Sequence, residues 1–359
     1  MASTKVTDEE RIMPTLCKPA IDLPEFVVTH DETVDMTERV HADHPQLALA
    51  IRLIKNVGVA KRHIVLPVAE ALRHPGLAAR NATYEREAKS RIPQVVAEAL
   101  GNAGVGPDDI DALIVVSCTG FVMPSLTAWM VNTLGFPRHV AQIPIAQLGC
   151  AAGGSSINRA HDYCLSHPGR NVLIVACEFC SLCYQPDDLD VGNLLSNALF
   201  GDAIAAAVML GDGGTGISIE AHCSYILPGT EKWIAYEVRE TGFHFMLDKR
   251  VPDTMRAVTP VCQEFVAEHG WNMSDLDYYI IHTGGPKVLS TLRDQADIRE
   301  ERLEYSRTTL RERGNIASAS IFDVARRIFD SADTKPGDTF LIGGFGPGIT
   351  AELAVGTWR

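Results

Sequence analysis

Residues 149–163, GCAAGGSSINRAHDY, indicate the fold, because residues 314–329, GNIASASIFDVARRIF, repeat their pattern. Each stretch begins with a glycine, carries a polar residue next, and continues through small residues into a run with helical spacing of its apolar positions. The two polar residues are Cys150 and Asn315. The pattern predicts two equivalent helices, each of which begins beside a chemically useful side chain.

The segments around these two stretches also repeat. In the first half the neighbouring blocks are DDIDALIVVSCTG (108–120), RNVLIVAC (170–177) and FGDAIAAAVML (200–210). In the second half they are SDLDYYIIHTGGP (274–286), GDTFLIGG (337–344) and FGPGITAELAV (345–355). From Asp111 to Cys150 is 39 residues, and from Asp277 to Asn315 is 38. Blocks that recur in the same order and at the same spacing predict an internal duplication.

The duplication divides the chain into two expected halves. The first, residues 1–220, carries Cys150, and the second, residues 221–359, carries His282 and Asn315, with the join in the glycine-rich stretch 211–220. Apolar runs predict buried strands at 111–117, 171–177, 204–210, 278–282, 339–343 and 349–355, and helical spacing predicts helices at 91–104 and 318–332. Strands that alternate with helices favour a layered α/β fold with mixed sheets.

The composition excludes several classes of protein. The chain has 359 residues, of which 46% are hydrophobic and 21% charged, so it has the apolar content that a disordered chain lacks. A net charge of −13 disfavours non-specific binding to nucleic acid. No apolar run approaches the ~20 residues of a membrane-spanning helix. The N-terminus has no signal-peptide core, so we expect a cytoplasmic protein that binds neither nucleic acid nor membranes.

Two motifs suggest cofactors, but each lacks the residues that would complete the site. CEFCSLC (177–183) has closely spaced thiols, yet no second ligand pair accompanies it, so we expect no metal and interpret it as a buried strand end that leads into a loop. GFGPG (344–348) lacks the full spacing and context of a dinucleotide fingerprint. We expect it to join two strands, which disfavours an oxidoreductase.

Cys150, His282 and Asn315 are the candidate catalytic residues. A cysteine at a helix N-terminus is exposed to the positive end of the helix dipole, so we expect a lowered thiol pKa and a nucleophile suited to accept an acyl group from a thioester. His282 and Asn315 can each donate a hydrogen bond to one oxygen, as an oxyanion hole for an enolate requires. The structural alternatives are a packed cysteine, a core histidine and an asparagine N-cap, the last of which is compatible with catalysis.

These residues and their surroundings resemble the type III polyketide synthases, the chalcone-synthase-like branch of the thiolase superfamily. The shared motifs are QLGCAAGG (147–154), LFGDA (199–203), HTGGP (282–286), GNIAS (314–318) and GFGPGIT (344–350). Within that family, SCTGFVMPSLTAW (117–129), CEFCSLCYQP (177–186) and TGFHFMLDKRVP (241–252) are similar to the tetrahydroxynaphthalene synthase branch. The resemblance implies a homodimer of thiolase-fold subunits with five αβαβα layers and no metal or redox cofactor.

The resemblance also implies roles for further residues. Phe200 and Phe245 match two phenylalanines between the coenzyme A tunnel and the reaction cavity. Met123 matches a methionine that reaches into the partner subunit's cavity, and Pro124 matches a proline with a cis bond. Cys118, Cys183 and Tyr236 match positions that line the cavity, although plain packing is an equal alternative for each of these three.

Two further positions follow the family less closely. Arg52 aligns with a residue that binds coenzyme A phosphates, and Lys55 is a positional assignment in the same basic stretch, residues 52–63. A solvated helix face is the alternative. Ser196 lies near the position where some relatives carry a further cysteine, which weakens any mechanism that uses two thiols.

The expected activity is iterative decarboxylative condensation of malonyl-CoA on Cys150, followed by cyclisation to 1,3,6,8-tetrahydroxynaphthalene. One alternative is a type III synthase that uses another acyl-CoA starter to make a pyrone or an alkylresorcinol. A β-ketoacyl-carrier-protein synthase is less consistent with one His and one Asn in these places. A thiolase-fold scaffold without catalysis is the alternative from a different class.

Overall fold

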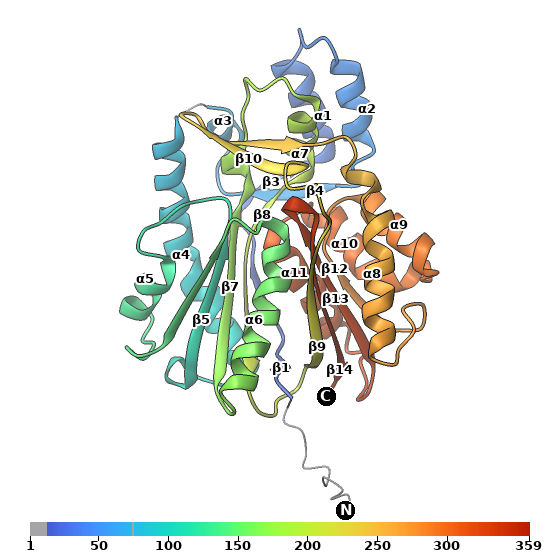
Figure 1. Ribbon diagram of the computed structural model, residues 1–359. Helices are drawn as coiled ribbons and strands as arrows, with labels where there is room; N and C mark the ends of the chain where they lie inside the picture. The colour runs from blue at the N-terminus through green and yellow to red at the C-terminus, as the bar shows by residue number, and fades with distance from the viewer. Residues whose placement is uncertain (1–12, 74) are drawn as a thin grey trace, which may run out of the picture.

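The computed structural model describes residues 13–73 and 75–359, and a mixed ten-stranded sheet lies at its centre (Figure 1). Its strand order is β12-β13-β14-β9-β1-β8-β7-β5-β6, with β2 paired to β8. These strands are β1 (Thr15–Leu16), β2 (Ala20–Asp22), β5 (Ile110–Ser117), β6 (Ala141–Ala146), β7 (Asn171–Phe179), β8 (Asp202–Leu210), β9 (Ile217–Ile226), β12 (Tyr278–Ile281), β13 (Thr339–Gly346) and β14 (Thr350–Trp358). Each of the six predicted strands is present, with ends shifted by a few residues.

The sheet repeats its own topology about its middle. Strands β5 and β7 are parallel and β7 and β8 antiparallel, just as β12 and β13 are parallel and β13 and β14 antiparallel. The carboxylate of Asp111 accepts the backbone N–H of Asn171 at 2.9 Å, and that of Asp277 accepts the N–H of Thr339 at 3.0 Å. The same side chain therefore joins equivalent strands in both halves, as the sequence repeat predicts.

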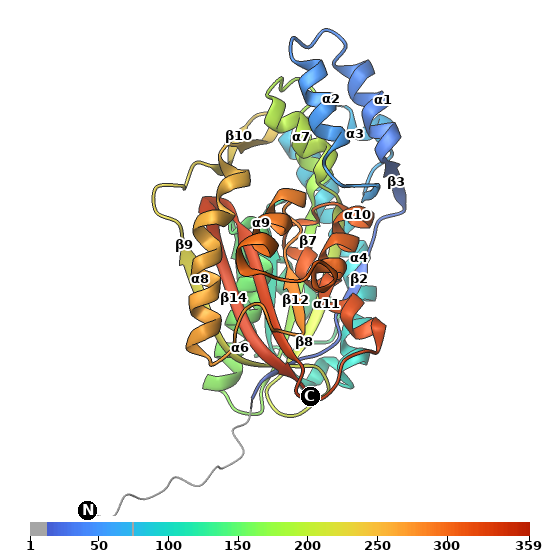
Figure 2. The ribbon, with the colours of Figure 1, turned by 90° about the vertical axis from the view of Figure 1, so that its right-hand side faces the viewer.

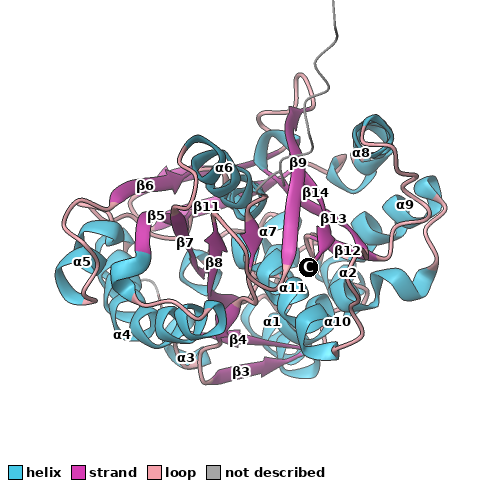
Figure 3. Ribbon diagram, turned by 90° about the horizontal axis from the view of Figure 1, so that it is seen from below, coloured by secondary structure: helices cyan, strands magenta, loops and turns pink. Residues whose placement is uncertain are grey.

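The strands of the first half and those of the second half form two wings of this sheet, with helices between the wings and on their outer faces (Figure 3). Helices α6 (Ala152–Ser166) and α11 (Ser320–Ser331) lie between the two wings and contact strands of both. The helices that cover the outer faces are α4 (Leu77–Ala103) and α5 (Leu126–Thr133) on one wing, and α8 (Met255–Glu268), α9 (Pro286–Ala296) and α10 (Glu304–Arg313) on the other. The arrangement is the expected αβαβα thiolase fold.

The two central helices approach the opposite half closely. A Cβ atom on Gly153, inside α6, would collide with the carbonyl oxygen of Ser318, which precedes α11. A Cβ atom on Gly346, at the end of β13, would collide with the backbone of Ala151. The glycines of the two repeated motifs therefore allow the backbones of the two halves to touch where the candidate residues lie.

A smaller layer covers one end of this core. It contains α1 (His30–Val40), α2 (Leu47–Lys55), α3 (Val68–Ala71), α7 (Val191–Leu199), the strand pair β3 (Phe26–Thr29) and β4 (Lys61–Ile64), and the hairpin β10 (Ile234–Arg239) and β11 (Gly242–Leu247). In two perpendicular views α1 and α2 lie at the end opposite the C-terminus (Figure 2). Thr29 and Glu32 form a capping box that starts α1.

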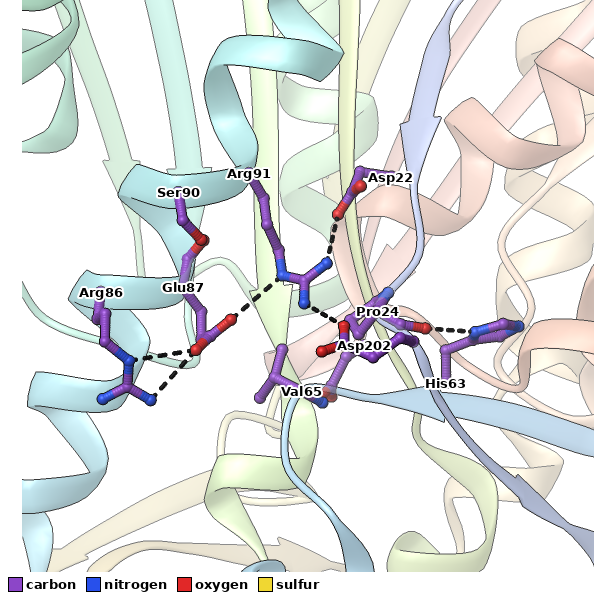
Figure 4. Close-up of polar contacts among 10 residues, drawn as sticks. Asp22, Pro24, His63, Val65, Arg86, Glu87, Ser90, Arg91 and Asp202 are labelled. Atoms are coloured by element: carbon purple, nitrogen blue, oxygen red, sulfur yellow. Dashed lines mark hydrogen bonds and ion pairs between the residues drawn. The ribbon is translucent and has the colours of Figure 1, made fainter.

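Helix α4 is longer than predicted, since it begins at Leu77 and not at residue 91. It ends where predicted, at Gly104, which adopts the left-handed conformation that favours glycine. Arg91 of α4 forms ion pairs with Glu87 one turn earlier and with Asp22 of β2 at 3.4 Å (Figure 4). None of the described helices combines the length and apolar composition needed to cross a membrane.

Candidate active site

A cavity of about 1310 Å³ lies between the core and the covering layer, and both halves of the chain contribute to its lining. Cys150, His282 and Asn315 all line it. Three of the non-glycine residues with positive φ also line it, namely Gln147 (62°), Ala317 (46°) and Ile349 (42°). Strained backbone of this kind is retained where the surrounding structure fixes a functional geometry.

Cys150 lies in the 3-10 turn Gly149–Ala151, directly before the first residue of α6. Gly149 adopts φ of 52°, and its α-carbon faces the ring of Pro347 so closely that a side chain would not fit. This turn aims Cys150 into the cavity at a helix N-terminus, as predicted from GCAAGG.

Asn315 is held by the first half of the chain. Its backbone N–H donates to the carbonyl of Leu199 at 2.8 Å, and its own carbonyl accepts the N–H of Gly201 at 3.0 Å. Its side-chain Oδ1 accepts the N–H of Ala317 at 2.9 Å, which holds the turn before α11, whereas the N-cap of α11 is Ala319 and not Asn315 as the capping alternative expected. Because Oδ1 is engaged, Nδ2 is the group that can donate to a ligand in the cavity.

His282 follows the last residue of β12, Ile281, and is 2% exposed. Its backbone N–H donates to the carbonyl of Gly343 in the neighbouring strand at 2.9 Å, which fixes the position of the ring. Burial lowers the pKa of the His282 imidazole to about 3. A neutral imidazole has one N–H, so His282 and Asn315 together offer two uncharged donors to an oxygen in the cavity.

Burial of Cys150 works against the thiolate that its place before a helix favours. Burial raises the pKa of the Cys150 thiol to about 12, and the nearby carboxylate of Glu178 raises it further. The contact with Asn315 Oδ1 at 3.9 Å lowers the pKa, but by less. Burial therefore shifts the pKa values of both the Cys150 thiol and the His282 imidazole toward their neutral forms.

Glu178, which sequence reasoning missed, connects the two halves beneath this site. One carboxylate oxygen accepts the hydroxyl of Ser318 at 2.5 Å. The other accepts the hydroxyl of Thr119 at 3.0 Å and the backbone N–H of Cys118 at 3.1 Å. Burial raises the pKa of Glu178 to about 7. The acidic residue at the end of a buried apolar strand is the sequence signal that could have identified it.

Three aromatic rings form one wall of the cavity. The rings of Phe200 and Phe245 meet edge to face with centroids 5.3 Å apart, and Tyr236 lies 5.7 Å from Phe245. Phe200 ends α7, whereas Tyr236 and Phe245 are paired across the β10–β11 hairpin. The hairpin and α7 thus bring together residues that are distant in the sequence, and they exclude water from one side of the site.

Comparisons with known proteins agree on the family. Residues 23–218 match the family described as FAE1/Type III polyketide synthase-like protein, and residues 218–356 match the C-terminal domain of chalcone and stilbene synthases. The chain belongs to the type III polyketide synthases.

Individual relatives in this family cover almost the whole chain. It is 57% identical to the 1,3,6,8-tetrahydroxynaphthalene synthase of Streptomyces coelicolor over 97% of this chain and 93% of that protein. A crystal structure of that S. coelicolor synthase superposes with a TM-score of 0.95, over 96% of this chain and 99% of the solved one. The chain is also 47% identical to the phloroglucinol synthase of Pseudomonas fluorescens, over 96% of this chain and 99% of that protein.

The thiols expected in this synthase's cavity fall in two places. Cys118 lines the main cavity together with Tyr236. Cys183 instead lines a separate cavity of about 70 Å³ on the other side of the aromatic wall, where the hydroxyl of Tyr236 bonds to it. Ser196 lines both cavities. The expectation that Cys183 lines the reaction cavity is therefore not met in a single subunit.

The loop after β5 carries Met123 on the outside of the synthase. Met123 is 81% exposed and lines a surface hollow of about 480 Å³ rather than its own subunit's main cavity. The bond between Met123 and Pro124 is cis, as the family resemblance implies. Phe121, in the same loop, is 60% exposed and lines both the hollow and the main cavity.

The expected coenzyme A contacts, Arg52 and Lys55, are exposed on α2 and do not line the cavity. Their chain neighbours Leu53 and Asn56 do line it. Lys287, at the start of α9, is exposed and lines the cavity directly. Sequence reasoning missed Lys287, although it follows the HTGGP motif immediately.

The two sequence motifs that are similar to cofactor sites, CEFCSLC and GFGPG, have structural roles. CEFCSLC forms the end of β7 and the 3-10 turn Cys180–Cys183, and GFGPG leads from β13 to β14 as predicted. Within the described part of the chain, one cluster has side chains spaced as metal ligands, and it consists of His161, Asp162 and His222 on α6 and β9. That cluster is separate from the cavity lining.

Proposed function

We propose that the chain is a 1,3,6,8-tetrahydroxynaphthalene synthase that uses malonyl-CoA as both starter and extender. The observation that carries this proposal is the common cavity, whose lining includes Cys150, His282 and Asn315. The 57% identity to a synthase of that name over nearly the whole chain supports the product. The proposal requires coenzyme A thioesters as substrates and no metal or redox cofactor.

The first step loads the nucleophile. The sulfur of Cys150 attacks the thioester carbonyl of malonyl-CoA, coenzyme A leaves as a thiol, and the malonyl group remains on the cysteine. His282 takes the proton of the Cys150 thiol in the same step as the sulfur attacks, and this proton then passes to the sulfur of the departing coenzyme A.

The second step forms the carbon–carbon bond. A malonyl-CoA extender loses carbon dioxide, and the electron pair of the broken bond forms an enolate. The N–H of His282 and Nδ2 of Asn315 donate to the enolate oxygen, which stabilises its charge. The enolate carbon attacks the Cys150 thioester, the thiolate leaves, and the longer chain returns to Cys150. The apolar rings of Phe200 and Phe245 favour loss of the charged carboxylate.

Charged groups at the cavity rim support binding of the coenzyme A phosphates. Lys287 on α9 lines the cavity, and Arg52 and Lys55 are exposed on α2, next in the chain to the lining residues Leu53 and Asn56. Exposed cations attract phosphates without a requirement for buried partners. We propose all three as contacts to the nucleotide end of the substrate.

We also propose a homodimer in which Met123 enters the partner subunit's cavity. Two large apolar side chains, Phe121 and Met123, are exposed in one loop. The neighbouring strand β6 is at the edge of the sheet, and an uncovered edge favours pairing with a second copy. We further propose that the chain divides into halves 1–220 and 221–359 and that the protein is cytoplasmic.

The test is a product assay with purified protein and malonyl-CoA as the only substrate, read by mass spectrometry. Tetrahydroxynaphthalene, or the quinone that it forms in air, would support the proposal. Phloroglucinol would reassign the product, and turnover only with another acyl-CoA starter would indicate a pyrone or alkylresorcinol synthase. The Cys150→Ala variant is the control, and wild-type protein without turnover on any starter would favour a scaffold.

A further inference from the structure

The small cavity behind the aromatic wall is a candidate binding site in its own right. It has a volume of about 70 Å³ and shares five lining residues with the main cavity. The shared residues are Cys180, Ser196, Phe200, Tyr236 and Phe245. A group that passes between these side chains would reach the small cavity from the site of condensation.

Two buried donors in this small cavity lack an acceptor. They are Nη1 of Arg62, on β4, and Nδ2 of Asn197, on α7. Arg62 is 5% exposed, and an unpaired guanidinium or amide donor at such depth is costly. Two such donors on one cavity indicate a ligand that is anionic and accepts hydrogen bonds.

The carboxylate of Asp202 interacts electrostatically with Arg62, but its oxygens already accept other hydrogen bonds. They accept the backbone N–H of Val65 at 2.8 Å, and the backbone N–H and hydroxyl of Ser181 at 2.8 and 2.5 Å. Burial lowers the pKa of Arg62 to about 10, which still leaves the guanidinium charged at neutral pH. Arg62 therefore keeps both its charge and a free N–H for a ligand.

The volume restricts the ligand to a small anionic group. With about 70 Å³ against about 1310 Å³ for the main cavity, the small cavity has room for a few water molecules or one small carboxylate. It is too small for an aromatic ring or for the nucleotide end of coenzyme A. The two oxygens of a carboxylate can also accept one guanidinium N–H and one amide N–H at the same time.

We propose that Arg62 and Asn197 bind the terminal carboxylate of the malonyl starter chain carried by Cys150. The inference rests on the proposed function. A carboxylate paired with a cation resists decarboxylation, because its charge moves into the departing bond and loses the partner. The apolar face of Phe200 and Phe245 has the opposite effect on an extender. The starter carboxylate is thus kept on the Arg62 side of the aromatic wall, and the extender carboxylate is lost on the side of the main cavity.

The experiment measures which acyl group resides on Cys150. Protein is mixed briefly with malonyl-CoA, quenched in acid, and the Cys150 peptide is analysed by mass spectrometry. A retained starter gives malonyl-Cys150. A starter that loses carbon dioxide and gains a proton gives acetyl-Cys150. Loading by hexanoyl-CoA, which has no terminal carboxylate, is measured in parallel.

Two substitutions remove the donors separately. We expect Asn197→Leu and Arg62→Met to lower the ratio of malonyl- to acetyl-Cys150 by about tenfold, the effect of one hydrogen bond to a charged group. Hexanoyl loading should be unchanged. Arg62→Lys retains the charge and should lie between wild type and Arg62→Met. The matched control is Asn102→Leu, at an exposed asparagine of α4 far from either cavity.

Three outcomes would overturn the inference. The first is an unchanged ratio in folded Asn197→Leu protein, judged by its melting temperature. The second is an equal loss of malonyl and hexanoyl loading, which would indicate a structural role. The third is a variant that still loads malonyl normally but whose melting temperature no longer rises when bicarbonate is added to the protein. That result would assign the site to free bicarbonate. Failure of the wild-type protein to load either substrate would contradict the proposed function instead.

Discussion

The sulfur of Cys150 lies 3.9 Å from Oδ1 of Asn315, although 165 residues separate them in the chain. The same Oδ1 accepts the backbone N–H of Ala317, so one end of the amide fixes the turn and the other remains free to donate. The two roles of this side chain can be separated by substitution, and this gives the first prediction.

We expect Asn315→Asp to keep the fold and lose the reaction. A carboxylate oxygen can still accept the N–H of Ala317, but the donor Nδ2 becomes a second acceptor that repels an enolate. Release of carbon dioxide from malonyl-CoA should fall by about 10² to 10³, the effect of removing one donor from an oxyanion hole. A wild-type rate would show that Asn315 serves only to hold the turn at Ala317, and the melting temperature is the control.

Alkylation of Cys150 should accelerate steadily as the pH rises. The raised thiol pKa leaves little thiolate at neutral pH, so the rate constant for iodoacetamide should increase about tenfold per pH unit between pH 7 and 9. The readout is the fraction of modified Cys150 peptide, with Cys150→Ser as the control for other thiols. A rate that is already constant at pH 7 would instead indicate a preformed ion pair with His282.

Glu178→Gln should make stability less dependent on pH. The native pKa of Glu178 is about 7, above its usual 4.5, so the folded state binds more protons than the unfolded state between these values. Stability conferred by the neutral carboxyl is therefore lost as the pH rises from 4.5 to 7, by about 3 kcal/mol.

Urea unfolding at pH 5 and pH 7.5 measures this effect. Asp202, whose pKa is raised to about 6, contributes a loss of the same sign and should remain in the variant. The difference between the two pH values should therefore shrink without vanishing. An identical difference in wild type and Glu178→Gln would show that the buried carboxyl does not titrate in this range.

Two helical glycines should respond oppositely to alanine. Gly101, near the end of α4, has open space around it, so Gly101→Ala should be neutral or stabilising by up to about 1 kcal/mol. Gly153 in α6 abuts the carbonyl of Ser318, so Gly153→Ala should destabilise by about 1–3 kcal/mol despite the same gain in helix propensity. Denaturant unfolding of both variants tests the comparison, and similar changes would contradict close contact of the halves.

Lys287→Ala should weaken binding of malonyl-CoA without a change in kcat. An exposed cation contributes up to about 1 kcal/mol to an ion pair, so KM should rise about two- to fivefold, and the increase should shrink at high salt. Lys335→Ala, at an exposed lysine remote from the cavity, is the control. An equal effect of both substitutions would indicate general charge attraction rather than a contact at the rim.

The sequence was sufficient for the repeat, the strands and the three catalytic candidates. These features are local or periodic. A run such as 171–177 is buried because nearly every residue in it is apolar. The glycine before Cys150 indicates a turn at that position. The family resemblance added the cis bond before Pro124, which composition and periodicity do not encode.

The remaining features depend on contacts between distant segments. The direction of the Cys150 pKa shift is set by burial and by Glu178, and neither is visible in the motif GCAAGG. Cys183 faces the small cavity because of the 3-10 turn in which it lies, and the β10–β11 hairpin supplies Tyr236 between it and the main cavity. Arg62 is only one basic residue among several in the sequence, and its burial became apparent from the fold.

The backbone bridge between Leu199 and Asn315 has a consequence for the order in which a ribosome makes the chain. The carbonyl of Leu199 is synthesised early, and its partner N–H follows more than a hundred residues later. At elongation rates of about 5–20 residues per second, that interval is on the order of ten seconds. During it the nascent first half has no Asn315 to complete its turn and no β14 to cover β9, so the newborn polypeptide must avoid aggregation until translation is nearly finished.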